Sequence, residues 1–251
     1  MTLFLAALLL PVQAAAPTIP PAPVLPPDSK PFYRAHTSPA CSNWSAARAG
    51  SAPEHKARFG IYRMWVEGYV TGFNMVGPDR SGDLFGANSH DEVYSVVDGY
   101  CARNPSHMVV DAMAPMAAAF IRRRLQTPPA ETRSRDASRQ AFATVTTTCG
   151  HWHEHRNNAV LRLAYGSVVR GYLTAYNRWG PDPAGDAIGA ADELIEDWVD
   201  GWCRERPSKL LVQVVHPLVA HVAAGRAAGR LPPAGKLPTD VLSPGGAPKD
   251  R

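Results

Sequence analysis

The chain has 251 residues, enough for one large domain or two small ones. Its hydrophobic fraction of 45% argues against wholesale disorder, and its formal net charge is +4. The basic residues are scattered without a stripe of interleaved aromatic and basic side chains, so the sequence does not favour a nucleic-acid partner. The 24 prolines crowd at the two ends and in the middle, which predicts linkers around folded segments.

The first residues predict export. Residues 3–10 form an apolar run that is too short to span a bilayer, and small residues follow at 12–14. We therefore predict a signal peptide over 1–14, although it lacks a Lys or Arg before the apolar run. No later run has the length and hydropathy of a transmembrane helix, so we expect a periplasmic or secreted protein without a membrane-spanning segment.

Short motifs recur in the same order roughly a hundred residues further along the chain, which predicts a tandem duplication. CSNW at 41–44 recurs as CGHW at 149–152, GYVT at 68–71 as GYLT at 171–174, GPD at 77–79 as GPD at 180–182, and VDGYC at 97–101 as VDGWC at 199–203.

Each copy holds one early and one late cysteine. The economical pairing is Cys41 with Cys101 and Cys149 with Cys203. Export favours such pairing, and a module of about 80 residues has a small core that gains from a crosslink. Four buried free thiols are the alternative.

Apolar side chains at helical spacing predict an all-α fold without a sheet. The first helix of each copy spans 59–73 and 161–176 and ends near Asn74 and Asn177. The second helix carries the late cysteine. A third is expected to begin at Pro105 and Pro207, with a kink at the internal prolines Pro115 and Pro217.

These patterns divide the chain into six segments. After the signal peptide we expect a proline-rich disordered segment (15–40), a first helical module (41–124), a linker (125–148), a second helical module (149–230) and a disordered tail (231–251).

The order Cys-x-x-Trp, an aromatic helix ending in Gly-Tyr-Val/Leu-Thr, a Gly-Asp loop and Tyr/Trp-Cys-x-x-x-Pro resembles a family of small secreted helical proteins of proteobacteria. They are related to type VI secretion immunity proteins of the Rap/Tai type and, more distantly, to the acid-stress periplasmic chaperone HdeA. The resemblance implies a periplasmic, disulfide-bonded helical domain that has no catalytic residues and binds another protein. The four cysteines match those of the family; the doubling, the proline-rich tails and the basic charge depart from it.

Histidines at 151, 153 and 155 are the best candidate metal ligands. Imidazole is a common ligand, and on a helix His151 and His155 share a face while His153 points away. The first copy has no histidine at the corresponding positions, and a solvated polar face is the alternative interpretation.

A loop of Gly, Pro and Asp occurs in both copies. Asp79 and Asp83 in the first copy correspond to Asp182 and Asp186 in the second, and their carboxylates suggest calcium as one ligand. The spacing is not that of an EF-hand, and the same residue types serve a structural turn.

The recurrent acids Asp98 and Asp200 lack a paired acid at a fixed spacing, so a polar helix position or a hydrogen bond to the neighbouring module is the simpler interpretation. No motif of a known catalytic class is present, and we expect no cofactor and no enzymatic activity. The sequence therefore predicts a protein-binding module pair acting as an immunity protein or inhibitor. The alternatives are an acid-stress chaperone, a structural envelope protein or a metal-binding protein.

Overall fold

The computed structural model describes residues 34–77, 90–126, 146–181, 185–189 and 192–229. Outside these residues lie the predicted signal peptide, most of the proline-rich segment and of the linker, and the C-terminal tail. Asp79, Asp83 and Asp182 also lie outside them. Within them the chain is helical, and two isolated bridges, Ala40 with Met108 and Thr148 with Leu210, take the place of a sheet. The all-α prediction is confirmed.

The helices are α1 (Cys41–Ala49), α2 (Pro53–Val76), α3 (His90–Arg103), α4 (Val109–Gln126), α6 (Cys149–Glu154), α7 (Ala159–Trp179), α8 (Asp192–Arg204) and α9 (Val215–Ala227), with the 3₁₀ helix η1 (Leu211–Val214) before α9.

Local sequence sets where the central helices begin. Pro53 occupies the first turn of α2, where its missing N–H costs nothing. The side chain of Asn158 caps α7 by accepting the N–H of Leu161 at 3.1 Å. Both helices end at glycines, Gly77 and Gly180, two residues or more beyond the asparagines that were expected to stop them.

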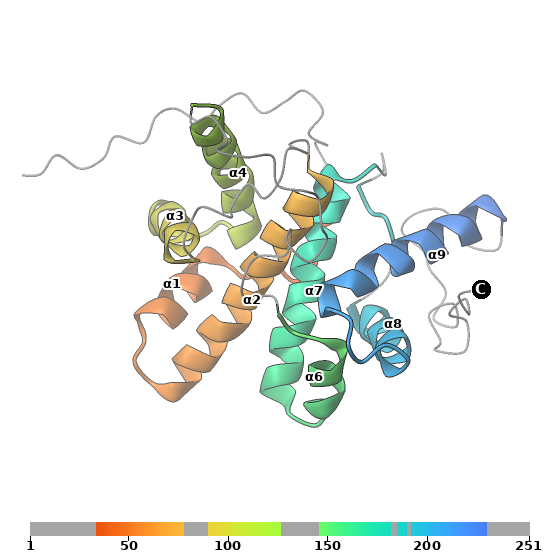
Figure 1. The fold of residues 1–251 in the computed structure, drawn as a ribbon. Coiled ribbons are helices and arrows are strands. Elements are labelled where there is room, and N and C mark those ends of the chain that lie inside the picture. Colours follow the sequence, from red (N-terminus) through yellow and green to blue (C-terminus); the bar gives the residue numbers. More distant parts are fainter. Residues whose placement is uncertain (1–33, 78–89, 127–145, 182–184, 190–191, 230–251) are drawn as a thin grey trace, which may run out of the picture.

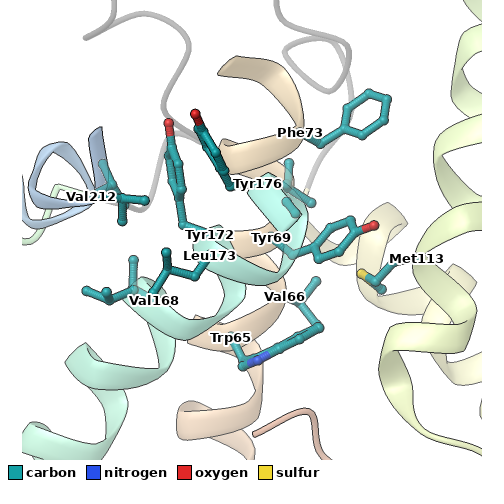
Figure 2. Packing of buried hydrophobic residues seen from close by; sticks show 14 of the residues in the cluster. Trp65, Val66, Tyr69, Phe73, Met113, Val168, Tyr172, Leu173, Tyr176 and Val212 are labelled. Carbon is teal, nitrogen blue, oxygen red and sulfur yellow. The ribbon is translucent and has the colours of Figure 1, made fainter. Parts of the chain in front are cut away.

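Helices α2 and α7 pack against each other in the middle of the molecule (Figure 1). Helices α1, α3 and α4 lie on the α2 side, and α6, α8 and α9 lie on the α7 side. Buried aromatic and aliphatic residues of the two central helices belong to one contiguous hydrophobic cluster. In Figure 2, Tyr69 of α2 points toward Met113 of α4, and Val168 and Tyr172 of α7 lie on the other side, near Val212. The two modules therefore share one hydrophobic core.

Glycines allow this close approach. A Cβ added at Gly68 would lie 2.1 Å from the carbonyl oxygen of Val168, and one added at Gly171 would lie 2.0 Å from that of Trp65. The two contacts are reciprocal, because a shift of 103 residues converts Gly68 into Gly171 and Trp65 into Val168. Backbone-to-backbone contact of this kind excludes any side chain at either position.

Residues 34–40, named the strap here, cross from the second module to the first. The N–H of Arg34 donates to the carbonyl of Gly185 at 2.8 Å, and the N–H of His36 donates to the Thr174 hydroxyl at 2.9 Å. The carbonyl of His36 accepts the indole N–H of Trp65 at 2.8 Å. The strap thus ties the C-terminal part of α7 to α2, whereas the sequence analysis placed 34–40 in the disordered segment 15–40.

The predicted start of the third helix at Pro105 and Pro207 is wrong. The backbone after Pro105 turns and pairs with the strap: Cys41 N–H donates to the carbonyl of His107 and Val109 N–H donates to that of Pro39, both at 2.8 Å. Because the backbone after Pro105 bonds to this distant segment, the helix α4 begins only at Val109. Pro115 lies inside α4 as expected, whereas Pro217 falls in the first turn of α9, where a proline needs no donor.

Candidate protein-binding surface

The two disulfides join Cys41 to Cys101 and Cys149 to Cys203, which confirms the predicted pairing. Each connects the short helix at the start of a module to the helix that carries the recurrent aspartate, α3 or α8. The short helices α1 and α6 were not predicted, because their few apolar residues give no periodic signal.

In the first module a buried tryptophan follows the first cysteine. The indole N–H of Trp44 donates to Asp98 at 2.7 Å, and Arg48 lies 3.4 Å from the same carboxylate. Phe59 meets the Trp44 ring edge-on with centroids 5.1 Å apart, and the Arg48 guanidinium lies 4.9 Å from the Phe59 ring centroid. Asp98 therefore bonds within its own module, not to the neighbouring one as the sequence allowed.

The second module repeats the tryptophan–aspartate bond with different neighbours. Trp152 donates its indole N–H to Asp200, and Arg162 donates to the other carboxylate oxygen at 2.9 Å. The Arg162 guanidinium also covers the Trp152 ring at 3.7 Å from its centroid, where the first module has Phe59. Burial alone would raise the pKa of the Asp200 carboxyl, but the hydrogen bonds from Arg162 and Trp152 and the Arg162 charge outweigh it and lower that pKa.

A carboxylate, Glu67, lies fully buried in the middle of α2. One of its oxygens accepts the Tyr94 hydroxyl and lies 3.5 Å from Nε of Arg63 and 3.6 Å from Nδ1 of His90. Its other oxygen, Oε2, has no hydrogen-bond partner among the described residues. Burial, followed by the negative charge of Glu67, raises the pKa of Tyr94, so the phenol keeps its proton and continues to donate. The position gave no signal in the sequence beyond an acid within an apolar helix.

The corresponding position of α7 carries the opposite charge. Arg170 is 8% exposed and donates to Glu196 of α8, the residue that corresponds to Tyr94. Glu196 also lies 3.7 Å from Nε of Arg162. The two modules thus use an acid and a base at equivalent buried positions to hold the next helix.

The three histidines lie at the N-terminal end of the second module. His151 completes a capping box with Thr148, and His153 is half-buried. His155 lies 6.0 Å from the Tyr165 ring and 3.9 Å from Glu154. Among the described residues no group of three His, Cys, Asp or Glu side chains converges on a common point, and metal binding by His151, His153 and His155 stays a prediction.

Asp186 is the one member of the repeated Asp set that the structure describes. Its Oδ1 accepts the N–H of Gly189 at 2.9 Å, and its Oδ2 lies 3.2 Å from Arg34 of the strap. Gly185 and Gly189 on either side adopt left-handed backbone conformations that favour glycine. At this position the residue types serve a turn that also anchors the strap.

Two exposed apolar side chains lie close together at the start of α7. Val160 and Leu163 in the first turns of α7 are 47% and 49% exposed, and the only other exposed large apolar side chain among the described residues is Met108, at 39%. We name Val160 and Leu163 the α7 apolar patch. The sequence does not reveal this patch, because periodicity shows that a helix is amphipathic but not which apolar residues another helix covers.

The described helices include none with the length and hydropathy needed to cross a membrane. Comparison with models of known protein families, with curated proteins and with solved structures found no match to this chain.

Proposed function

We propose that this chain is a non-enzymatic, exported protein that binds another protein through the α7 apolar patch. The observation that carries this proposal is the exposure of Val160 and Leu163, because the other large apolar side chains whose burial the structure describes, apart from Met108, are buried or half-buried. Exposed apolar residues that cluster on a rigid scaffold are typical of protein-contact sites. An immunity or inhibitor role, with one target bound in a fixed ratio, is the specific form that we favour.

Two features support the rest of the proposal. Two disulfides in a chain of this size are typical of proteins that function outside the cytoplasm. The recurrence of motifs, of the tryptophan–aspartate bonds and of the reciprocal glycine contacts supports an origin by duplication of one module. The proposed duplication would make α2 and α7 the two halves of a former twofold interface.

To test this proposal, the purified, disulfide-bonded protein is immobilised and incubated with an envelope extract at pH 7. Captured proteins are identified by mass spectrometry. A captured protein is then purified and mixed with the wild type, with Leu163→Glu and with Met108→Glu. We expect a complex of fixed stoichiometry that Leu163→Glu abolishes and Met108→Glu retains, since both substitutions place an acid at an exposed apolar position. Equal loss in both variants, or no partner that reconstitutes from purified components, would refute the proposal.

An acid-activated chaperone is the second candidate, favoured by two groups in the second module. The lowered pKa of Asp200 means that its contribution to stability is present above the unfolded value of 3.8 and is lost as the pH falls through the folded value. Burial lowers the pKa of His216, which is bonded to the Tyr172 hydroxyl at 2.7 Å, below 6.5. The unfolded chain therefore takes up that proton first, and stability falls as the pH drops below 6.5. Suppression of client aggregation at pH 3 but not at pH 7 would favour this role over the inhibitor.

A further inference from the structure

The surface along which α2 and α7 pack, called the seam here, can be compared position by position between the two helices. The recurrent motifs relate α2 to α7 by a shift of 103 residues, and the close contacts at Gly68 and Gly171 are reciprocal under this shift. The seam therefore has a nearly twofold arrangement. Two copies of one module could pair in the same way unless particular side chains prevent it.

Gly72 and Ala175 occupy equivalent positions of the two helices and meet across the seam. A Cβ added at Gly72 would lie 2.9 Å from the Cβ of Ala175 and 2.8 Å from the carbonyl oxygen of Tyr172. The seam thus has room for one methyl group at this point and not for two. Two second modules would place Ala175 against Ala175 and force the helices apart, whereas two first modules would place two glycines there and leave a gap.

An indole at the end of α7 gives the seam a second asymmetry. Trp179 donates its N–H to the Tyr69 hydroxyl of α2 at 3.0 Å and packs edge-on against Phe73, with ring centroids 5.2 Å apart. The corresponding residue of α2 is Val76, which has neither a ring nor a donor in its side chain. A pair of first modules would therefore lose both contacts.

The strap adds a third asymmetry. It precedes the first module in the chain but bonds to the second: besides the bonds to Thr174 and Gly185, the side chain of Asn177 donates to the carbonyl of Arg34 at 2.9 Å. A pair of second modules would lack residues 34–40 and all of these bonds. Each kind of like pair thus loses contacts that the unlike pair makes.

Both disulfides lie within a module, and all four cysteines are used in them, so the seam and the strap join the modules by non-covalent contacts. We propose that the seam is a selective recognition surface on which the first module accepts a second module, of this chain or of another copy, without help from the linker. Gly72, Ala175 and Trp179 select against like pairs. The inference does not depend on the α7 apolar patch.

The test starts from the full-length, disulfide-bonded protein with a protease recognition sequence inserted within 127–145. An isotope-labelled and an unlabelled sample are cut after folding, unfolded together in guanidinium without reductant, and refolded by dilution. Native mass spectrometry distinguishes the pairs, because the two halves differ in mass. We expect unlike pairs with mixed labels, and like pairs below about a tenth of the total. Like pairs as abundant as unlike pairs, or halves that do not reassociate although the uncut protein refolds, overturn the inference.

Three variants, cut without unfolding, test the residues that set the selectivity through the dissociation constant of the halves on dilution. Gly72→Ala is expected to weaken the pair at least about thirtyfold, and Gly72→Ala with Ala175→Gly is expected to recover at least about fivefold, since the second change removes the opposing methyl group. Gly60→Ala, on the same helix with no atom within 4 Å of the added Cβ, should stay within about twofold of the wild type.

The double variant separates recognition from general damage to α2. A double variant that pairs no more tightly than Gly72→Ala would mean that the two positions do not act on each other, and it would overturn the role given to them. The refolding experiment uses the unsubstituted seam, so the selectivity is tested even if Gly72→Ala does not fold.

Discussion

The first module (41–124) and the second (149–230) place a tryptophan against an aspartate in the same way, yet they surround it differently. In the first, Phe59 packs on Trp44 and Arg48 approaches Asp98 from α1. In the second, one residue of α7, Arg162, covers Trp152 and also binds Asp200. In the second module a cation takes the place that the aromatic ring of Phe59 has in the first, and it performs both tasks.

The buried positions of the central helices differ more strongly. Glu67 of α2 bonds to Tyr94, whereas Arg170 of α7 bonds to Glu196. Both arrangements connect a central helix to the next helix of its module, and each gives the buried charge a hydrogen-bond partner on that helix. The backbone arrangement therefore tolerates either sign of charge at this position, provided that the partner on the next helix changes with it.

Transferring the Arg170–Glu196 pair of the second module into the first tests this tolerance most directly. Glu67→Arg leaves a buried cation beside Arg63 and Tyr94 and should reduce the free energy of unfolding by about 4 kcal/mol or more. Adding Tyr94→Glu supplies the missing carboxylate and should recover at least about 1.5 kcal/mol. The measurement is a double-mutant cycle by guanidinium unfolding. Strict additivity of the two substitutions would show that the positions are not equivalent.

The two disulfides should stabilise the protein almost equally. They close loops of similar length, with sequence separations of 60 and 54 residues. In the chain-entropy model each contributes about 4 kcal/mol. Replacing both cysteines of one pair with Ala, first Cys41 with Cys101 and then Cys149 with Cys203, compares them directly by thermal unfolding. Losses that differ by more than about 2 kcal/mol would mean that local packing, and not loop closure, dominates in one module.

The reciprocal glycine contacts predict that Gly68→Ala and Gly171→Ala lose similar amounts of stability. Gly68→Ala and Gly171→Ala each place a methyl group against a backbone carbonyl that cannot move independently of its helix, so each should destabilise the protein by about 3 kcal/mol. Gly60→Ala is the control on the same helix; with open space around it, it should stabilise by up to about 1 kcal/mol through helix propensity. A loss in only one of the two seam variants would show that the interface is not reciprocal.

The sequence predicted the helical class, the disulfides and the positions of the main helices, because apolar spacing and paired motifs are local signals. It placed the third helix too early, since the bonds of Cys41 and Val109 to distant backbone groups have no local signature. The exposure of Val160 and Leu163 depends on which parts of α7 the neighbouring helices cover, which is a property of their packing. The buried Glu67 was missed for the same reason, because its partners Tyr94 and His90 come from another helix.

The smallest expected effect on stability comes from removing the charge of Asp200 or Asp98, the aspartates that accept the tryptophan N–H groups. Asp200→Asn keeps an acceptor for the Trp152 N–H but removes the charge that binds Arg162, and because Asp200 is one-third exposed we expect a loss of only about 1 kcal/mol at pH 7. Since the pKa of Asp200 is lowered, the wild type loses this contribution as the pH falls below about 3.8, so the gap between wild type and Asp200→Asn should narrow there. Asp98→Asn is the matched variant in the first module, where the Arg48 contact is longer, at 3.4 Å. Unfolding curves of both variants between pH 7 and pH 3 provide the comparison. A gap for Asp200→Asn that stays constant over this range would show that Arg162 stabilises the module through its packing on Trp152 and not through the charge of Asp200.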